Sequence, residues 1–228
     1  MKILVAPAAF KETLSPRQAA DALAAGVRRA LPEAQILACP VADGGDGLLD
    51  VVLAPDALRE TVRVTDPLGE PVVAELGWLD PQTAILESSA ACGLALVPLT
   101  DRDPLRTTTR GVGELIWEAV ERGARTVVVG LGGSATVDAG TGAARALGWQ
   151  FYGADDAPLP AGGGALADLA RVGSGWALDA SVVALADVTT PLVGPDSAAP
   201  LFAPQKGATP QAVDRLTRGL ARVGEVFA

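Results

Sequence analysis

Apolar and polar residues follow a strand-helix rhythm over the first fifty positions. Residues 2–6, KILVA, are a short apolar run that predicts a buried strand, and apolar residues then recur at helical spacing from Ala20 to Leu31. Ser15 and Pro16 are typical of a helix start, as the N-cap and the first helical residue. A second strand is expected in QILACPV, residues 35–41, and another helix begins in LLDVVLA. Strands that alternate with helices in this way favour a parallel sheet.

The rhythm changes between residues 60 and 88. Alternating residues on either side of the turn DPLGE predict an antiparallel pair of strands, TAILES predicts a further strand, and SAACGLALVP a short helix. From Gly111 the strand-helix pattern returns: an amphipathic helix ends at Gly123, and a strand follows in RTVVVGL. Later segments predict a buried strand in SVVALADV and a last helix capped by Thr209.

This succession predicts an α/β protein with a flavodoxin- or Rossmann-like parallel sheet in three layers, plus a second, smaller and irregular α/β region. We assign residues 1–58 and 106–190 to the parallel, phosphate-binding domain. Residues 59–105 and 191–228 are assigned to the second region.

Composition and charge narrow the function classes. The 228 residues carry a net charge of −9, which argues against a nucleic-acid partner because such binders present a basic face. No apolar run approaches the roughly 20 residues of a membrane span, and the N-terminus does not read as a signal peptide. We therefore expect a cytoplasmic protein without a membrane partner, in which Cys39 and Cys92 are reduced thiols. A homodimer is compatible with the sequence.

The chain contains no histidine. This excludes a Ser-His-Asp triad, a Cys-His pair and a histidine metal site, so any general base must be Asp, Glu, Lys, Cys or Tyr.

Four loops after predicted strands could carry chemistry. Ligands of α/β folds bind beyond the carboxyl ends of the parallel strands, so we expect these loops to converge on one cleft. They are APAAFK at 6–11, ADGGDG at 42–47, GLGGSAT at 130–136 and ADVTTPL at 186–192.

The segment GGSAT is predicted to bind phosphate. Glycines let backbone N–H groups approach an anion, the following helix adds partial positive charge, and hydroxyls can donate. A tight turn without a ligand explains the same glycines equally well. The predicted phosphate-binding residues are Gly132, Gly133, Ser134, Ala135 and Thr136.

Two acidic positions are candidates for binding Mg²⁺ or accepting a proton. Asp43 lies with Asp46 beside the bare glycines Gly44 and Gly45, and Asp187 follows an apolar strand. Ordinary Asp-Gly turns and helix capping remain the alternatives.

Lysine, arginine and threonine side chains are the remaining candidate site residues. Two of the three lysines, Lys11 and Lys206, fall in candidate loops, the latter beside Gln205; a lysine near phosphoryl oxygens stabilises developing charge, although most lysines are simply solvated. The segment around Arg106 could grip a carboxylate with Thr107, Thr108 and Thr109, or one threonine could merely cap the next helix.

Seven segments together resemble the bacterial class I glycerate kinase family and occur in that family's order. They are KILVAPAAFKETLS, PVADGGDG, LESSAACGLALV, PLRTTTRGVGELI, GLGGSATVDAGTGAARALG, LADVTTPLVGP and APQKGATP. The chain departs from the family's pattern at Ala8-Ala9, where Asp-Ser is usual, and at Val137 and Thr190, where asparagine is usual. Family members also run on beyond the last helix, so the chain is expected to be truncated or a shortened member.

The resemblance implies ATP-dependent phosphorylation of D-glycerate to 2-phosphoglycerate between two α/β domains. In this interpretation Lys11, Asp43 and Asp187 are catalytic, and Asp43 and Asp187 hold Mg²⁺ with the ATP phosphates. Gly44, Gly45, the GGSAT segment, Gln205 and Lys206 would contact phosphate or substrate, and Arg106 with the three threonines the substrate carboxylate.

Two other interpretations stay open. Gly130, Gly132 and Ala135 match the dinucleotide pattern G-x-G-x-x-A, with Asp155 or Asp156 as the ribose-binding acid, which would indicate an NAD(P)-dependent oxidoreductase. A shortened chain without the Asp-Ser pair could also be a non-catalytic family member.

Overall fold

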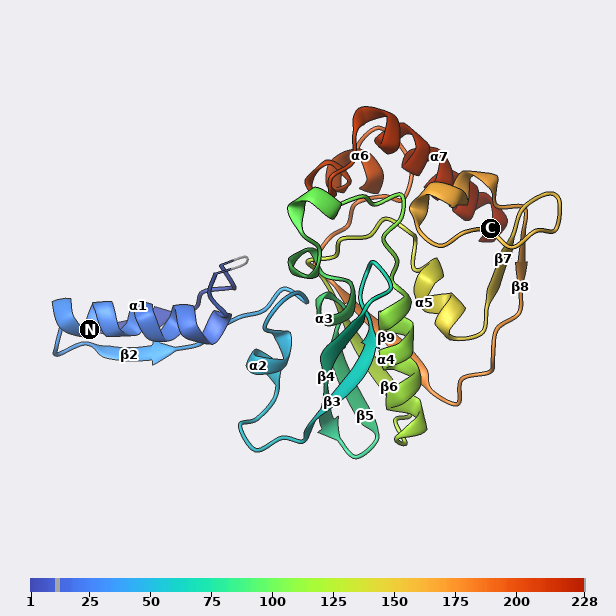
Figure 1. The fold of residues 1–228 in the computed structure, drawn as a ribbon. Helices are drawn as coiled ribbons and strands as arrows, with labels where there is room; N and C mark the ends of the chain where they lie inside the picture. Colours follow the sequence, from blue (N-terminus) through green and yellow to red (C-terminus); the bar gives the residue numbers. More distant parts are fainter. Residues whose placement is uncertain (11–12, 228) are drawn as a thin grey trace.

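The computed structural model describes residues 1–10 and 13–227, which form an N-terminal arm and a larger body (Figure 1). In the arm, the strands β1 (Lys2–Val5) and β2 (Gln35–Ala38) pair in parallel, with α1 (Pro16–Ala30) between them in sequence and packed on the pair. The start of α1 is a full capping box: Ser15 Oγ accepts from Gln18 N at 3.2 Å, and Ser15 N donates to Gln18 Oε1 at 2.9 Å. The predicted helix start is confirmed.

The arm is less buried than its apolar sequence predicts. Leu4 of β1 is 63% exposed and Leu37 of β2 is 65% exposed, and Val5 alone among the residues of the two strands is buried. Parallel strands are usually covered on both faces, whereas in the described residues α1 covers this pair from one side. The prediction of a buried first strand is therefore wrong.

The body contains one five-stranded sheet with the strand order β3-β4-β5-β6-β9. β3 and β4 are antiparallel, as are β4 and β5, while β5, β6 and β9 run parallel. The antiparallel segment assigned from the sequence to a second region thus shares this sheet with the parallel strands, whereas β1 and β2 form a separate sheet. The strands span Arg59–Thr65, Pro71–Asp80, Thr83–Glu87, Thr126–Leu131 and Ser181–Ala186 in that order.

Helices cover both faces of this sheet near β5. Alternate residues of β5 point to opposite sides, so that Leu86 packs with α4 and Ile85 with α2. Both side chains are at most 1% exposed, and burial of each stabilises the fold by about 1.5–3 kcal/mol. These helices and the short ones beside them are α2 (Leu48–Val52), α3 (Ser89–Cys92), η1 (Leu94–Leu96), η2 (Leu99–Asp101), α4 (Arg110–Glu121) and α5 (Thr141–Ala146).

In the C-terminal part of the chain, α6 and α7 lie above the sheet in Figure 1, and β7 and β8 lie beside it. Its longest helix packs on the glycine-rich 3₁₀ segment, where Val223 clusters with Leu166 and Leu216 lies against Gly163. Thr209 Oγ1 caps this helix by accepting from Ala212 N at 3.2 Å. The elements are β7 (Gln150–Tyr152), η3 (Gly163–Asp168), β8 (Arg171–Gly173), α6 (Ala198–Phe202), η4 (Pro204–Lys206) and α7 (Pro210–Phe227).

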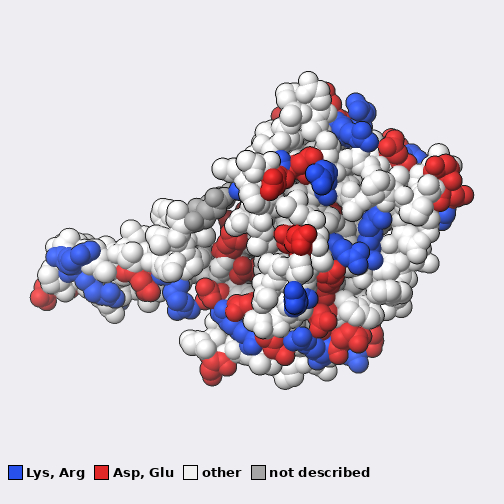
Figure 2. All heavy atoms as spheres, viewed as in Figure 1, with Lys and Arg blue, Asp and Glu red and all other residues white. Residues whose placement is uncertain are grey.

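The edge strand β9 differs from its prediction as a buried strand. Its apolar side chains remain open, with Val182 46% and Val183 43% exposed, because no described residue packs across them. On the face of the molecule in Figure 2, acidic and basic side chains are interspersed over the body, and acidic ones lie where the arm meets it. None of the helices in the described ranges has the length and apolarity needed to cross a membrane.

Candidate active site

The ends of three parallel strands define one edge of the main sheet. Because β5, β6 and β9 run in the same direction, Glu87, Leu131 and Ala186 lie at the same edge, and the residues that follow them face one region. The predicted loop 130–136 starts at this edge, and Asp187 is the first residue after β9.

The loop ADGGDG packs directly on this edge, backbone against backbone. An ideal Cβ on Gly132 would lie 2.7 Å from Gly45 Cα, and one on Gly44 would lie 3.0 Å from Leu185 O and 3.3 Å from Leu131 O. Gly44 also has a φ of +93°, a conformation that favours glycine. The predicted convergence is confirmed for the loops 42–47 and 130–136, and the close approach of their backbones explains part of their glycine content.

The loop after β1 reaches the same place. A small cavity of about 200 Å³ is lined by Phe10, Leu14 and neighbours on one side and by Asp46 and Gly47 on the other. Ala9 also lines it, so the Ala8-Ala9 departure from the family's pattern lies beside the acidic loop. The predicted catalytic residue Lys11 lies outside the described residues.

Backbone hydrogen bonds fix the conformation of the loop 132–136. Leu94 N donates to Gly133 O at 2.8 Å and Ala135 N donates to Cys92 O at 2.7 Å. Gly133 is exposed with a φ of +63°, and within residues 1–10 and 13–227 the backbone N–H groups of Gly133 and Ser134 donate to no protein acceptor. Two free N–H groups and the Ser134 hydroxyl are suited to bind an anion.

Lys206 lies under this loop, and its interpretation as a solvated side chain is wrong. It is 8% exposed, and its Nζ donates to Ser134 Oγ at 2.9 Å and to Thr136 O at 2.6 Å. Burial lowers its pKa to about 8, an effect opposed by Cys92 and Asp138 nearby. Since burial raises the pKa of Cys92 to about 12, that thiol is neutral when Lys206 titrates, and Asp138 supplies the opposing negative charge. Gln205 is exposed beside it.

Carboxylates also line the place where the loops 42–47 and 130–136 meet, which we call the loop junction: an ideal Cβ on Gly133 would lie 3.6 Å from Asp46 Oδ1. Asp43 is exposed and its Oδ1 accepts from Gly45 N at 3.1 Å, so it closes its own turn while keeping an oxygen free. Asp46 and Asp187 are also exposed. Glu87 is half-buried and accepts from Leu49 N at 2.8 Å, and burial raises its pKa.

The described residues contain no group of three metal-ligating side chains. Mg²⁺ is commonly bound through one or two carboxylates together with phosphate oxygens and water. The exposed carboxylates Asp43 and Asp187, at one sheet edge, fit that donor chemistry.

The threonine run has a structural position. Thr107 has no exposed surface and its Oγ1 donates to Ala135 O at 2.8 Å, while Thr109 Oγ1 donates to Asp138 Oδ2 at 2.9 Å. Thr108 is buried and its hydroxyl lies 3.5 Å from the same carboxylate. These hydroxyls therefore hold the loop 135–142 instead of facing a substrate, which corrects the prediction for Thr107 and Thr108. Arg106 is exposed.

Sequence reasoning missed three residues of this site. Glu87 is the last residue of β5 and Ser88 follows it, and Ser88 Oγ lies 3.5 Å from Gly132 N. Their position at the end of the predicted strand TAILES was the available signal. Asp138, in contrast, is 1% exposed inside a glycine-rich loop, and no periodicity marks such a residue.

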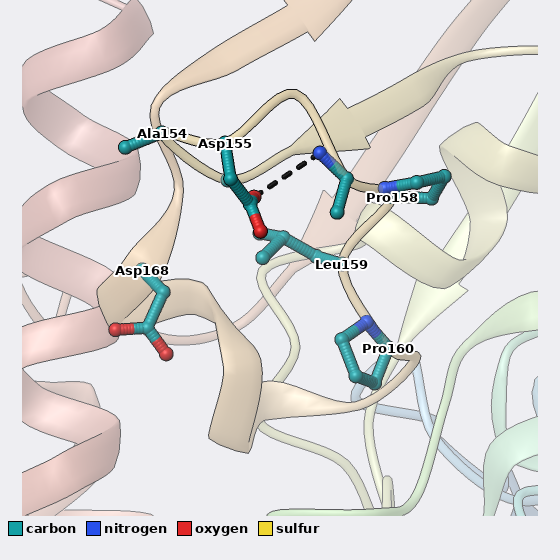
Figure 3. A pocket seen from close by; sticks show the side chains of 8 residues that line it. Ala154, Asp155, Pro158, Leu159, Pro160 and Asp168 are labelled. Atoms are coloured by element: carbon teal, nitrogen blue, oxygen red, sulfur yellow. Dashed lines mark hydrogen bonds between the residues drawn. The ribbon is translucent and has the colours of Figure 1, made fainter.

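The dinucleotide interpretation does not fit this topology. Asp155 follows β7, which pairs with β8 in a separate two-stranded sheet and is no neighbour of β6. A ribose-binding acid is expected at the end of a parallel strand beside the glycine loop. Asp155 Oδ1 accepts from Ala157 N at 3.1 Å within its own turn, as Figure 3 shows.

The surface pocket in Figure 3 is separate from the loop junction. It has a volume of about 490 Å³ and is lined by Asp155, Asp168 and the apolar turn Pro158–Pro160, among others. None of its lining residues belongs to the glycine loops or to η4. Its volume alone does not indicate a function, so we place the candidate active site at the loop junction.

Comparisons with known proteins show the family of the chain. The glycerate kinase family matches residues 3–228. The chain is 44% identical to the glycerate 2-kinase of Escherichia coli K12 and 43% identical to the glycerate kinase of Bacillus subtilis 168, with 100% and 99% of the chain covered. A crystal structure described as glycerate kinase 2 of Salmonella typhimurium LT2 superposes with a TM-score of 0.81 at 41% identity, covering all of this chain and 63% of the other. The chain spans about 61% of the length of the two curated relatives.

Proposed function

Because this chain belongs to the glycerate kinase family, we propose that its loop junction phosphorylates the 2-hydroxyl of D-glycerate with ATP and yields 2-phosphoglycerate. One observation carries the assignment to this site. Two glycine loops meet at the carboxyl edge of the parallel strands with a buried lysine, Lys206, beneath one of them and carboxylates beside the other.

The proposed phosphate contacts come from the loop 132–136. The free N–H groups of Gly133 and Ser134 and the Ser134 hydroxyl would bind phosphate oxygens, and the charge of Lys206 lies directly behind them. Lys11, which follows β1 in the sequence, is the second cation in the proposal. Asp43 and Asp187 would hold Mg²⁺, which when bound neutralises charge on the phosphates. Exposed Arg106 and Gln205 remain candidates for the carboxylate of glycerate.

The reaction needs positioning more than covalent catalysis. The 2-hydroxyl oxygen forms a bond to the γ-phosphorus while the bond from that phosphorus to the β,γ-bridging oxygen breaks, and ADP leaves with the bonding electrons. The hydroxyl proton passes late in the step to a carboxylate, for which Asp43 is the proposed acceptor. Backbone N–H groups fixed before the reaction stabilise the transferring group at no reorganisation cost.

Substitution of Asp43 tests the proposal in a coupled ADP-release assay with D-glycerate and Mg-ATP. Asp43→Asn keeps an oxygen that can accept from Gly45 N, so the turn and the melting temperature should change little, while turnover should fall at least about 100-fold because the charge is lost. Asp43→Ala should lose turnover and also loosen the turn. The matched control is Asp155→Asn, since Asp155 closes a similar turn away from the site.

Unchanged turnover in Asp43→Asn would refute the role of this carboxylate. If the folded wild-type chain releases no ADP and neither Mg-ATP nor D-glycerate raises its melting temperature, the interpretation as a non-catalytic family member is favoured, because a bound ligand stabilises the folded state.

A further inference from the structure

Asp138 is a buried carboxylate with an unusual number of donors. Its Oδ2 accepts from Thr109 N and from Thr109 Oγ1, both at 2.9 Å, and from Gly142 N at 3.1 Å, while its Oδ1 accepts from Gly140 N at 3.2 Å. The side chain is 1% exposed. Removing a charge from water to this extent costs free energy unless hydrogen bonds compensate for it. Loss of any of these donors should therefore destabilise the buried carboxylate.

These bonds tie together three parts of the candidate site. Thr109 precedes α4, Gly140 and Gly142 lie at the start of α5, and Asp138 continues the loop 132–136. The connection is reinforced from the same segment, because Thr107 Oγ1 donates to Ala135 O at 2.8 Å and Thr109 Oγ1 accepts from Ala143 N at 3.0 Å. Through Thr109 N, at the start of the twelve-residue α4, the carboxylate also lies at the positive end of that helix dipole.

The charge of Asp138 also acts on Lys206, the lysine that donates hydrogen bonds to the loop. The ionisable groups that act on Lys206 are Cys92 of α3 and Asp138, and the Cys92 thiol is neutral at physiological pH. The ammonium group of Lys206 contacts Ser134 Oγ and Thr136 O, one residue on either side of Ala135. Loss of the Asp138 charge would therefore act on the lysine and on the loop together.

We propose that Asp138 is a positioning residue for the phosphate loop: its carboxylate joins the starts of α4 and α5 to the loop 132–136 and supplies the negative charge opposite Lys206. Its side chain is too buried to contact a ligand and acts through Lys206 and the loop backbone. The inference rests on the proposed function as far as phosphate binding is concerned, whereas its effect on Lys206 can be measured without any ligand.

The test is a pH titration of the lysine side-chain NMR signals in Asp138→Asn. The chain has three lysines, so Lys206 can be identified by the signal lost in Lys206→Arg. We expect the midpoint of Lys206 to move to lower pH by about half a pH unit or more, the amide signals of Gly133 and Ser134 to shift, and the affinity for inorganic triphosphate at pH 7 to fall about tenfold. Asp155→Asn should change none of these.

An unchanged Lys206 midpoint together with unchanged loop signals in a folded Asp138→Asn variant would overturn the inference. If wild type fails to bind triphosphate, the proposed function fails, yet the lysine titration still decides the role of Asp138. If Asp138→Asn does not fold, Thr109→Val serves instead, because it removes one donor and keeps the charge. It should shift the Gly133 and Ser134 amides and leave the Lys206 midpoint in place, and no shift of these amides would contradict the proposal.

Discussion

Replacing Gly132 with alanine is expected to weaken binding of Mg-ATP at least about tenfold, or roughly 1.4 kcal/mol, and to abolish ADP release with D-glycerate. The added Cβ would lie 2.7 Å from Gly45 Cα and 2.8 Å from Gly45 N, so the two loops must separate. The contacts are backbone atoms, which have no flexible end that can move aside. Separation would move Asp43 away from the N–H groups of Gly133 and Ser134.

Gly26→Ala is the matched control for this substitution. An ideal Cβ on Gly26 meets no atom within 4 Å, and the residue lies inside α1, where alanine is favoured over glycine by about 1 kcal/mol. Isothermal titration with Mg-ATP should therefore show wild-type affinity for Gly26→Ala. Wild-type affinity for Gly132→Ala as well would mean that contact between the loops is irrelevant to binding.

Replacing Lys206 with methionine is expected to remove most triphosphate affinity while changing the melting temperature little. A pKa lowered from 10.5 to about 8 corresponds to about 3 kcal/mol of unfavourable free energy for burying the charge, which methionine does not incur. Against this stands the loss of the hydrogen bonds to Ser134 Oγ and Thr136 O, each of which leaves a group without a partner at a cost of about 1–3 kcal/mol. The two terms have similar size, so binding should change much more than stability.

The same lysine predicts opposite pH trends for binding and stability. Lys206 is charged in the folded protein below pH 8, so affinity for triphosphate should fall as the pH rises through about 8. Between about pH 8 and 10.5 the unfolded state binds more protons at this residue, so the free energy of unfolding contributed by Lys206 should rise across that range. Both trends can be isolated by comparing wild type with Lys206→Met over a series of pH values. Titration with triphosphate measures the affinity, and urea denaturation measures the free energy of unfolding. Parallel pH profiles for the two proteins would contradict them.

Much of the architecture could be predicted from local patterns. The capping box at Ser15, the amphipathic α4 and the strands around each glycine loop follow from spacing and turn chemistry, which act within a few residues. One topological rule about parallel strands brings the loops after β6 and β9 to the same edge, whereas the loop 42–47 follows β2 of a separate sheet and its approach does not follow from that rule. The assignment of strands to sheets could not be predicted in this way. An alternating pattern indicates that β3 and β4 are antiparallel, but it does not indicate which other strands lie beside them.

The misses share a physical cause, which is dependence on distant partners. Lys206 can be buried because Ser134, 72 positions away, accepts a hydrogen bond from its ammonium group, whereas an isolated lysine in a sequence is expected to be solvated. Thr107 and Asp138 likewise interact across about 30 residues with groups that no local pattern connects. For β9 the prediction failed in the opposite direction, because a strand predicted to be buried is exposed. Its apolar residues predict burial, but burial depends on what packs against the strand.

The most direct test of the account is an ¹⁵N-glycine NMR titration of the chain with Mg-ATP. Binding at the loop junction predicts that the amide signals of Gly44, Gly45, Gly132 and Gly133 shift together with one dissociation constant, while that of Gly153 in the separate pocket stays in place. Saturation with Mg-ATP that shifts Gly153 and leaves the four loop glycines unchanged would contradict the assignment of this junction as the phosphate site.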